Sequence, residues 1–337
     1  MPTELPAPRP AGPTPETAPE TPPQSPWQGV QGAILLLSLV VLLVLFLLPF
    51  LSDRPGRGRP WRVAITTPEL YGAEPKKGQE ANAPELDEGR RALVRETIIE
   101  TAERMLAARD GLVADTVLDL PEPEVAEGAN RAQRDRAIAR LIHEREFDEV
   151  LSMIVECSAK RCRTLLRRLR SVDASAEWRR SFSFDPHDSL AVEEELAGEL
   201  HVAFLKFSRR DGGSRLLADA ETYETFLRTR IDQRRGLIPP RRAISIVEPL
   251  RQKAPRSTSL HLFEAEMYEL GGDKELAADL LAEAHRIAPG DVRPLMRRVP
   301  LLLELRRSDE AKVALTQLEA MMPGDPRLLT WREYSGD

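Results

Sequence analysis

Small and apolar positions recur at a fixed spacing in the last third of the chain. Three prolines that follow apolar stretches lie 34 residues apart, at Pro255, Pro289 and Pro323. The same period separates three alanines and two rows of apolar residues: Ala243, Ala277, Ala311; Val247, Leu281, Leu315; Leu250, Ala284, Leu318. A constant period of this length predicts stacked helical hairpins, because one hairpin cannot bury its apolar face alone. We expect each proline to end the second helix of a hairpin.

The best copy of this period runs from Ser257 to Pro289 and reads STSLHLFEAEMYELGGDKELAADLLAEAHRIAP. It resembles the tetratricopeptide repeat family, whose small and apolar positions it matches at Ala265, Tyr268, Ala277, Leu281, Ala284 and Pro289. The flanking copies depart from the pattern, with Ile231 and Val299 where a small residue is usual. The resemblance covers about residues 218–325.

The resemblance implies an all-α solenoid over 218–337 that binds a protein partner in a groove and catalyses nothing. Repeat geometry puts His261, Glu264 and Tyr268 on the groove-facing side of the best copy, which makes them the candidate partner-binding residues. The alternative is an array of generic helical hairpins that lacks the family's groove.

Before the repeats, apolar strand patterns alternate with amphipathic helix patterns. WRVAIT at 61–66 and LVADTVLDL at 112–120 favour strands, and a stripe of apolar residues favours a helix over 87–109. A helix over 130–146, three strands and a helix over 189–207 follow. The predicted order is β-α-β-α-β-β-β-α, an α/β domain.

The only two cysteines, Cys157 and Cys162, lie in the stretch MIVECSAKRCRTLLRRL. A helix would put them on different faces, whereas two strands joined by the loop SAKR would put them opposite each other. Directly opposed strand residues come near disulfide reach, so a disulfide could form in an oxidising compartment. A zinc site would require His143 and His187 to join the cysteines, and we predict no metal site.

The stretch VLSMIVECSAKRCRTLLRRLRSVDASAEWRRSFSF resembles the TolB N-terminal-like domain, with Trp178 near the start of its last strand. The resemblance covers about residues 60–207 and implies that family's α/β fold. It departs from the family where VDASAEW lacks the usual turn glycine. Such domains precede tetratricopeptide repeats in membrane-tethered bacterial regulators, which implies a bacterial membrane protein that acts in signalling.

An uninterrupted apolar run, GAILLLSLVVLLVLFLLPFL, precedes these regions. It contains no charged residue and is long enough to cross a bilayer as a helix, so we predict a transmembrane helix at 30–51. Residues 1–29 form a proline-rich tail that we expect to be disordered, and residues 52–86 form a linker that contains the first strand.

The side of the membrane is less constrained by the sequence. Arg54, Arg57, Arg59 and Arg62 crowd the C-terminal flank of the apolar run, which favours a cytoplasmic location for the large C-terminal part. Regulators of the resembled type place these domains outside the cytoplasm, so a periplasmic location in a bacterial inner membrane is the alternative.

Charge and motifs exclude several functions. The net charge of −6 gives no electrostatic support for nucleic-acid binding. No phosphate-binding, dinucleotide-binding or metalloprotease motif occurs, so we predict no enzyme, no catalytic residue and no cofactor. The favoured function is a single-pass membrane-anchored scaffold that binds a protein partner. The alternative is a membrane signalling sensor whose α/β domain binds a ligand or an envelope signal.

Overall fold

The computed structural model describes residues 59–72, 86–117, 130–212 and 219–335. The chain divides into two units, Met1–Arg54 and Pro55–Asp337, and all described residues belong to the second. The predicted tail and the predicted membrane helix therefore lie outside the described residues. Within the described part of the chain, no helix is long and apolar enough to cross a membrane.

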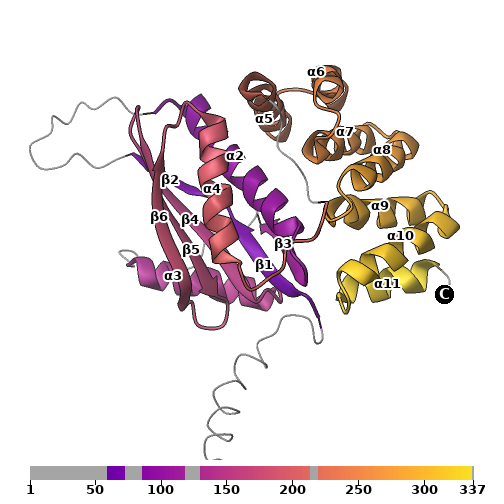
Figure 1. The fold of residues 1–337 in the computed structure, drawn as a ribbon, viewed down its shortest axis with the longest axis horizontal. Helices are drawn as coiled ribbons and strands as arrows, with labels where there is room; N and C mark the ends of the chain where they lie inside the picture. Colours follow the sequence, from indigo (N-terminus) through magenta and orange to yellow (C-terminus); the bar gives the residue numbers. More distant parts are fainter. Residues whose placement is uncertain (1–58, 73–85, 118–129, 213–218, 336–337) are drawn as a thin grey trace, which may run out of the picture. The chain divides into compact units, whose positions relative to one another are not determined.

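Six strands form one mixed sheet in the described residues. They are β1 Trp61–Thr66, β2 Glu69–Gly72, β3 Leu112–Val117, β4 Glu149–Cys157, β5 Cys162–Arg170 and β6 Ala176–Phe184. The order is β3-β1-β4-β5-β6. Both β1 and β2 pair with β4, β1 with its first residues and β2 with its last. Pairs among β1 to β4 are parallel, whereas β4–β5 and β5–β6 are antiparallel. β3 and β6 therefore lie at the two ends of this order, and β2 is also paired on one side only in the described residues (Figure 1).

Helices cover both faces of the sheet. They are α2 Glu88–Ala107, α3 Arg131–Glu144 and α4 Ser189–Ala203. α2 and α4 lie together over one face, and α3 lies on the other (Figure 1). Each helix begins at an acidic or amide side chain that accepts a backbone N–H, at Asp87, Asn130 and Asp188.

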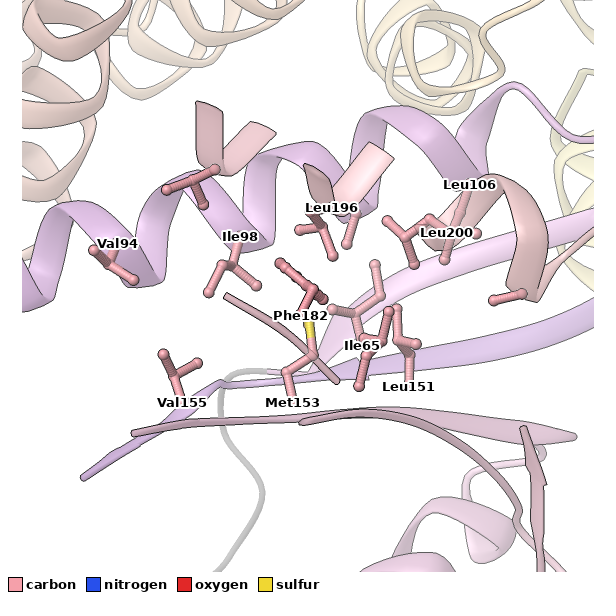
Figure 2. Packing of buried hydrophobic residues seen from close by; sticks show 14 of the residues in the cluster. Ile65, Val94, Ile98, Leu106, Leu151, Met153, Val155, Phe182, Leu196 and Leu200 are labelled. Carbon is pink, nitrogen blue, oxygen red and sulfur yellow. The ribbon is translucent and has the colours of Figure 1, made fainter. Parts of the chain in front are cut away.

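The main core lies between the sheet and the α2–α4 layer. Ile98 of α2 and Leu196 of α4 point toward Phe182 and the strand residues Ile65 and Leu151 (Figure 2). All but Phe182 are completely buried, and Phe182 is nearly so. This burial of large apolar side chains is the main source of stability for the layer.

The mixed α/β organisation of the middle region is confirmed, with one addition. Each predicted strand and helix is present within a few residues of its expected bounds. β2 was not predicted, because residues 69–72 were taken as part of the linker. Its sequence ELYG has little apolar content, and its pairing with β4 rather than its own composition makes it a strand.

The C-terminal region is a series of helical hairpins. Its helices are α5 Ala220–Arg234, α6 Pro240–Lys253, α7 Thr258–Leu270, α8 Lys274–Ile287, α9 Arg293–Glu304, α10 Ser308–Met321 and α11 Pro326–Ser335. The second helices of the hairpins, α6, α8 and α10, begin at Pro240, Lys274 and Ser308, which repeats the sequence period of 34 residues. The prediction of helical hairpins with this period is confirmed, whereas membership of the tetratricopeptide repeat family stays a prediction.

The periodic prolines have the predicted role, and the periodic alanines lie in the cores of the helical hairpins. Ala243, Ala277 and Ala311 are completely buried. α6, α8 and α10 each end shortly before one of the periodic prolines. Asp291 and Asp325 accept hydrogen bonds from the backbone of Arg293 and Arg327, and so hold the starts of α9 and α11.

The cysteines lie at the end of a β-hairpin. Cys157 is the last residue of β4 and Cys162 the first of β5, and they are directly opposed in the register. A disulfide joins them, with Cα atoms 4.1 Å apart. Both cysteines are buried in the main core, so the disulfide closes the tip of the hairpin against α4 and its neighbours.

Candidate protein-binding pocket between the sheet edge and the helical repeats

α2 has two buried faces, and each has a different partner. The first packs in the core of the sheet and comprises Val94, Ile98, Ala102 and Leu106. The second faces the helical repeats and comprises Leu93, Glu96, Glu100, Glu103 and Ala107. Spacings of three and four residues keep each set on one side of the helix. α2 is therefore shared between the sheet and the repeats.

Acidic residues of α2 bind arginines of α5. Glu96 Oε1 lies 2.9 Å from Arg230 Nε and 2.9 Å from Arg234 Nη1. Glu103 accepts a hydrogen bond of 2.9 Å from Arg230 Nη2. Because Glu96 and Arg230 are largely buried, these contacts lose less strength to water than surface ion pairs do.

Glu100 is the centre of a second polar contact. It is 1% exposed and accepts hydrogen bonds from the Tyr223 hydroxyl of α5 (3.0 Å) and the Ser259 hydroxyl of α7 (2.5 Å). Arg104 Nε lies 3.3 Å from its carboxylate. One carboxylate therefore connects α2 to two helical hairpins.

The surroundings shift the pKa values of these groups. Burial alone would raise the pKa of Glu103, but the Arg230 guanidinium and the Thr116 hydroxyl outweigh it and lower the pKa to about 2. Burial likewise opposes ionisation of Glu100, and Arg104 and Ser259 outweigh it, so its pKa is lowered. Both carboxylates are therefore charged at neutral pH.

Apolar contacts join the same surfaces. Leu93 of α2 packs in a cluster with Phe226, Leu260 and Phe263 of the first two hairpins. Ala107 and Val113 pack in the cluster formed by the later hairpins. The sheet edge and the repeats are thus held by apolar burial as well as by charge.

A pocket of about 440 Å³ remains where these surfaces separate. One wall is α2 and the edge strand β3, and the other is α5, α7, α9 and α11, which we call the inner helices. α6, α8 and α10 contribute no lining residue. We call this cavity the edge pocket. Its volume lies in the range of roughly 300–1,000 Å³ that is typical of ligand sites.

The edge pocket combines apolar walls with arginines. Its apolar lining includes Val113, Leu262, Phe263, Met296 and Trp331. Five arginines line it, namely Arg230, Arg234, Arg293, Arg297 and Arg327, together with the carboxylates of Glu103, Asp115 and Glu266. Such a mixture of apolar surface and directional polar groups is suited to holding a peptide segment.

Most polar groups of the pocket are already paired, which limits its chemistry. The Ser259 hydroxyl donates to Glu100 and the Thr116 hydroxyl to Glu103 (2.6 Å). Arg297 binds Glu266 and Glu269 of α7. Among the described residues, no three His, Cys, Asp or Glu side chains converge in a way that could hold a metal ion.

The three residues predicted to face a groove lie elsewhere. His261 is buried, and its Nδ1 is 2.8 Å from the Ser257 carbonyl oxygen. Glu264 is buried in an ion pair with Arg251 of α6, and Tyr268 packs partly buried among the later hairpins. None of the three lines the edge pocket. A partner contact through them stays a prediction.

The residues of α7 that do line the pocket are Ser259, Leu262, Phe263 and Glu266. They lie next to the predicted residues in sequence but on another side of the helix. The role of α2 was also missed. A signal was present, because Glu96, Glu100 and Glu103 recur at spacings of four and three on one face.

Comparisons with known proteins leave the family open. No model of a known protein family matches the chain, and no curated protein matches it. Among solved structures it is similar to the type III secretion chaperone SycD of Yersinia enterocolitica, solved in complex with a peptide of the translocator YopD. The match has a TM-score of 0.32 and 12% identity, and covers 36% of this chain and 97% of the chaperone. A similarity at this level does not identify a function, and the resemblance to the TolB N-terminal-like domain stays a prediction.

Proposed function

We propose that this protein is a single-pass membrane-anchored scaffold that binds a segment of a partner protein in the edge pocket. The observation that carries the proposal is the pocket itself, which lies between the inner helices and the sheet edge and retains both apolar and arginine surface. Its walls come from parts of the chain that α2 fixes together, so the site is preorganised.

The contact with α2 defines how much of the repeat surface is free for a partner. The first two hairpins bind α2 through Leu93, Glu96 and Glu100, so that part of the inner surface is already covered. The pocket is also lined by residues of α9, α11 and β3. A partner segment is therefore held between two parts of this protein and not on the repeats alone.

The membrane anchor in this proposal rests on the apolar run at 30–51. Two features favour different sides of a bacterial inner membrane. The arginines after the run favour the cytoplasm, whereas the Cys157–Cys162 disulfide favours an oxidising compartment. An alkaline phosphatase fusion after Asp337 tests the side: activity indicates the periplasm, and its absence together with thiols that label without reductant indicates the cytoplasm.

The binding proposal is tested by photo-crosslinking of the full-length chain in its native membrane. A benzophenone amino acid replaces Met296, which lines the pocket, and in a matched control replaces Val313, which is 60% exposed on α10. We expect a discrete protein adduct from position 296 that is absent at position 313 and is weakened by Trp331→Ala. Equal adducts at both positions, or none at position 296, would contradict the proposal.

A further inference from the structure

β3 presents an unpaired edge to the edge pocket. It is the last strand on its side of the sheet, and it pairs only with β1 in the described residues. Trp61 N donates to Gly111 O (2.8 Å), so strand alternation directs the backbone of Val113 and Asp115 toward β1. The backbone groups of Ala114 and Thr116 then face the pocket. Neither residue has a backbone hydrogen bond on that side to any part of the chain that the structure describes.

This edge lacks most devices that normally prevent strand addition. Proteins protect edge strands with charges, prolines, bulges or a covering element. β3, LVADTV, carries one charged residue and no proline, and its six residues pair with β1 without a register shift. Residues 114–116 are only partly buried, and all three line the edge pocket.

The opposite edge of the same sheet provides an internal comparison. β6 carries Glu177, Arg179 and Arg180, all exposed, and a register shift interrupts its pairing with β5 between Arg168 and Leu169. That edge has two of the usual protective devices. Of these two edges, only β3, which meets the pocket, pairs without a register shift and carries a single charged residue.

Side chains around β3 indicate the kind of strand that fits. Leu262, Phe263, Met296 and Trp331 offer apolar contacts to alternate side chains of an added strand. Arg234, Arg297 and Arg327 remain about one-third exposed, at 31%, 33% and 31%, and their guanidinium groups have donors for a further carboxylate. Each of these arginines already binds a carboxylate of the chain, so an added carboxylate would share its guanidinium group.

We propose that an extended segment of the partner protein, alternating apolar residues with at least one aspartate or glutamate, adds to β3 as a further strand in the edge pocket. This inference rests on the proposed function and specifies its mode of binding. Main-chain hydrogen bonds to Ala114 and Thr116 supply affinity. The apolar wall and the arginines supply selectivity for the sequence.

The test uses the full-length chain in lipid nanodiscs and a displayed library of random short peptides as the probe. Enriched peptides are synthesised, and N-methyl groups are placed in turn on each backbone nitrogen. Strand addition predicts an alternating result, because every second N–H of an added strand points to its neighbour. Methylation at one set of alternate positions weakens binding more than tenfold, and methylation at the other set has little effect.

Two protein variants complete the test. Ala114→Pro removes the outward N–H at an edge position where proline is tolerated. We expect this variant to weaken peptide binding by at least about twofold. Arg297→Ala weakens the binding of acidic peptides. It leaves unchanged the binding of peptides in which Asn and Gln replace Asp and Glu. Far-ultraviolet circular dichroism checks that each variant is folded, and the N-methyl series needs no protein variant.

The outcomes separate this inference from the proposed function. Suppose that peptides bind, that Trp331→Ala abolishes their binding, and that N-methylation gives no alternating pattern. This result would overturn strand addition and leave pocket binding intact. Enrichment of helical or basic peptides would overturn the proposed ligand class. Failure to enrich any peptide, together with no crosslinked adduct at position 296, would contradict both proposals.

Discussion

The attachment of α2 to the repeats gives the sharpest energetic prediction, at Glu100. Glu100→Ala removes the acceptor of two buried hydroxyls, Tyr223 and Ser259, and one carboxylate partner of Arg104. Removing one partner from such a buried charged contact costs about 3–5 kcal/mol. Arg104 keeps its contact with Glu193, which argues for the lower part of that range.

The matched control is Glu88→Ala, on the same helix. Glu88 lies 3.3 Å from Arg235 of α5, but the two side chains are 68% and 45% exposed. An exposed pair of this kind contributes less than about 1 kcal/mol. Both free energies of unfolding are measured by urea titration of the Pro55–Asp337 unit, followed by circular dichroism.

The comparison of the two variants decides whether α2 docks as described. The structure predicts that Glu100→Ala is the more destabilising by at least about 2 kcal/mol. Glu100→Gln keeps an acceptor oxygen and should lie between the two. Equal, small losses from Glu100→Ala and Glu88→Ala would refute a buried contact between α2 and the inner helices.

Three further predictions concern pH, the hairpin and a close backbone contact. The pKa of Glu103 is lowered from 4.5 to about 2, so its carboxylate stabilises the folded state fully above pH 4.5 and progressively less as the pH falls toward 2. Glu103→Gln should therefore flatten the acid side of a plot of unfolding free energy against pH, measured by urea titration. The disulfide closes a short loop with a sequence separation of 5. The double variant Cys157→Ser, Cys162→Ser should therefore lose about 2 kcal/mol of unfolding free energy. A loss above about 5 kcal/mol would contradict the loop-closure reasoning. A Cβ atom on Gly290 would lie 2.4 Å from the Asp211 carbonyl oxygen, whereas a Cβ atom on Gly198 would meet nothing within 4 Å. Gly290→Ala should therefore lower the midpoint of thermal unfolding, and Gly198→Ala should maintain or raise it.

Local patterns in the sequence were sufficient to predict most elements. The period of 34 residues located the hairpins because each small residue, such as Ala277, has to lie at the contact of two helices. The strand pair around Cys157 and Cys162 followed from apolar content and loop length. These features depend on residues near each other in the chain.

The candidate site depends on contacts between distant residues, which one sequence does not specify. Glu100 and Ser259 are 159 residues apart and form one hydrogen bond. Helical periodicity identifies the stripes of α7 but not which stripe meets β3, so His261 was chosen where Leu262 lines the pocket. The acidic stripe of α2 is visible in the sequence, but its burial depends on Arg230 of α5, which lies far away in the chain and pairs with Glu96 and Glu103.

Amide hydrogen exchange of the full-length chain, with and without its bound peptide or captured partner, tests the central claim most directly. The account predicts slower exchange at Ala114 and Thr116 of β3 and along α9 and α11 on binding, with α6, α8 and α10 unchanged. Protection confined to α6, α8 and α10, with exchange at Ala114 and Thr116 unaltered, would contradict binding between the sheet edge and the inner helices.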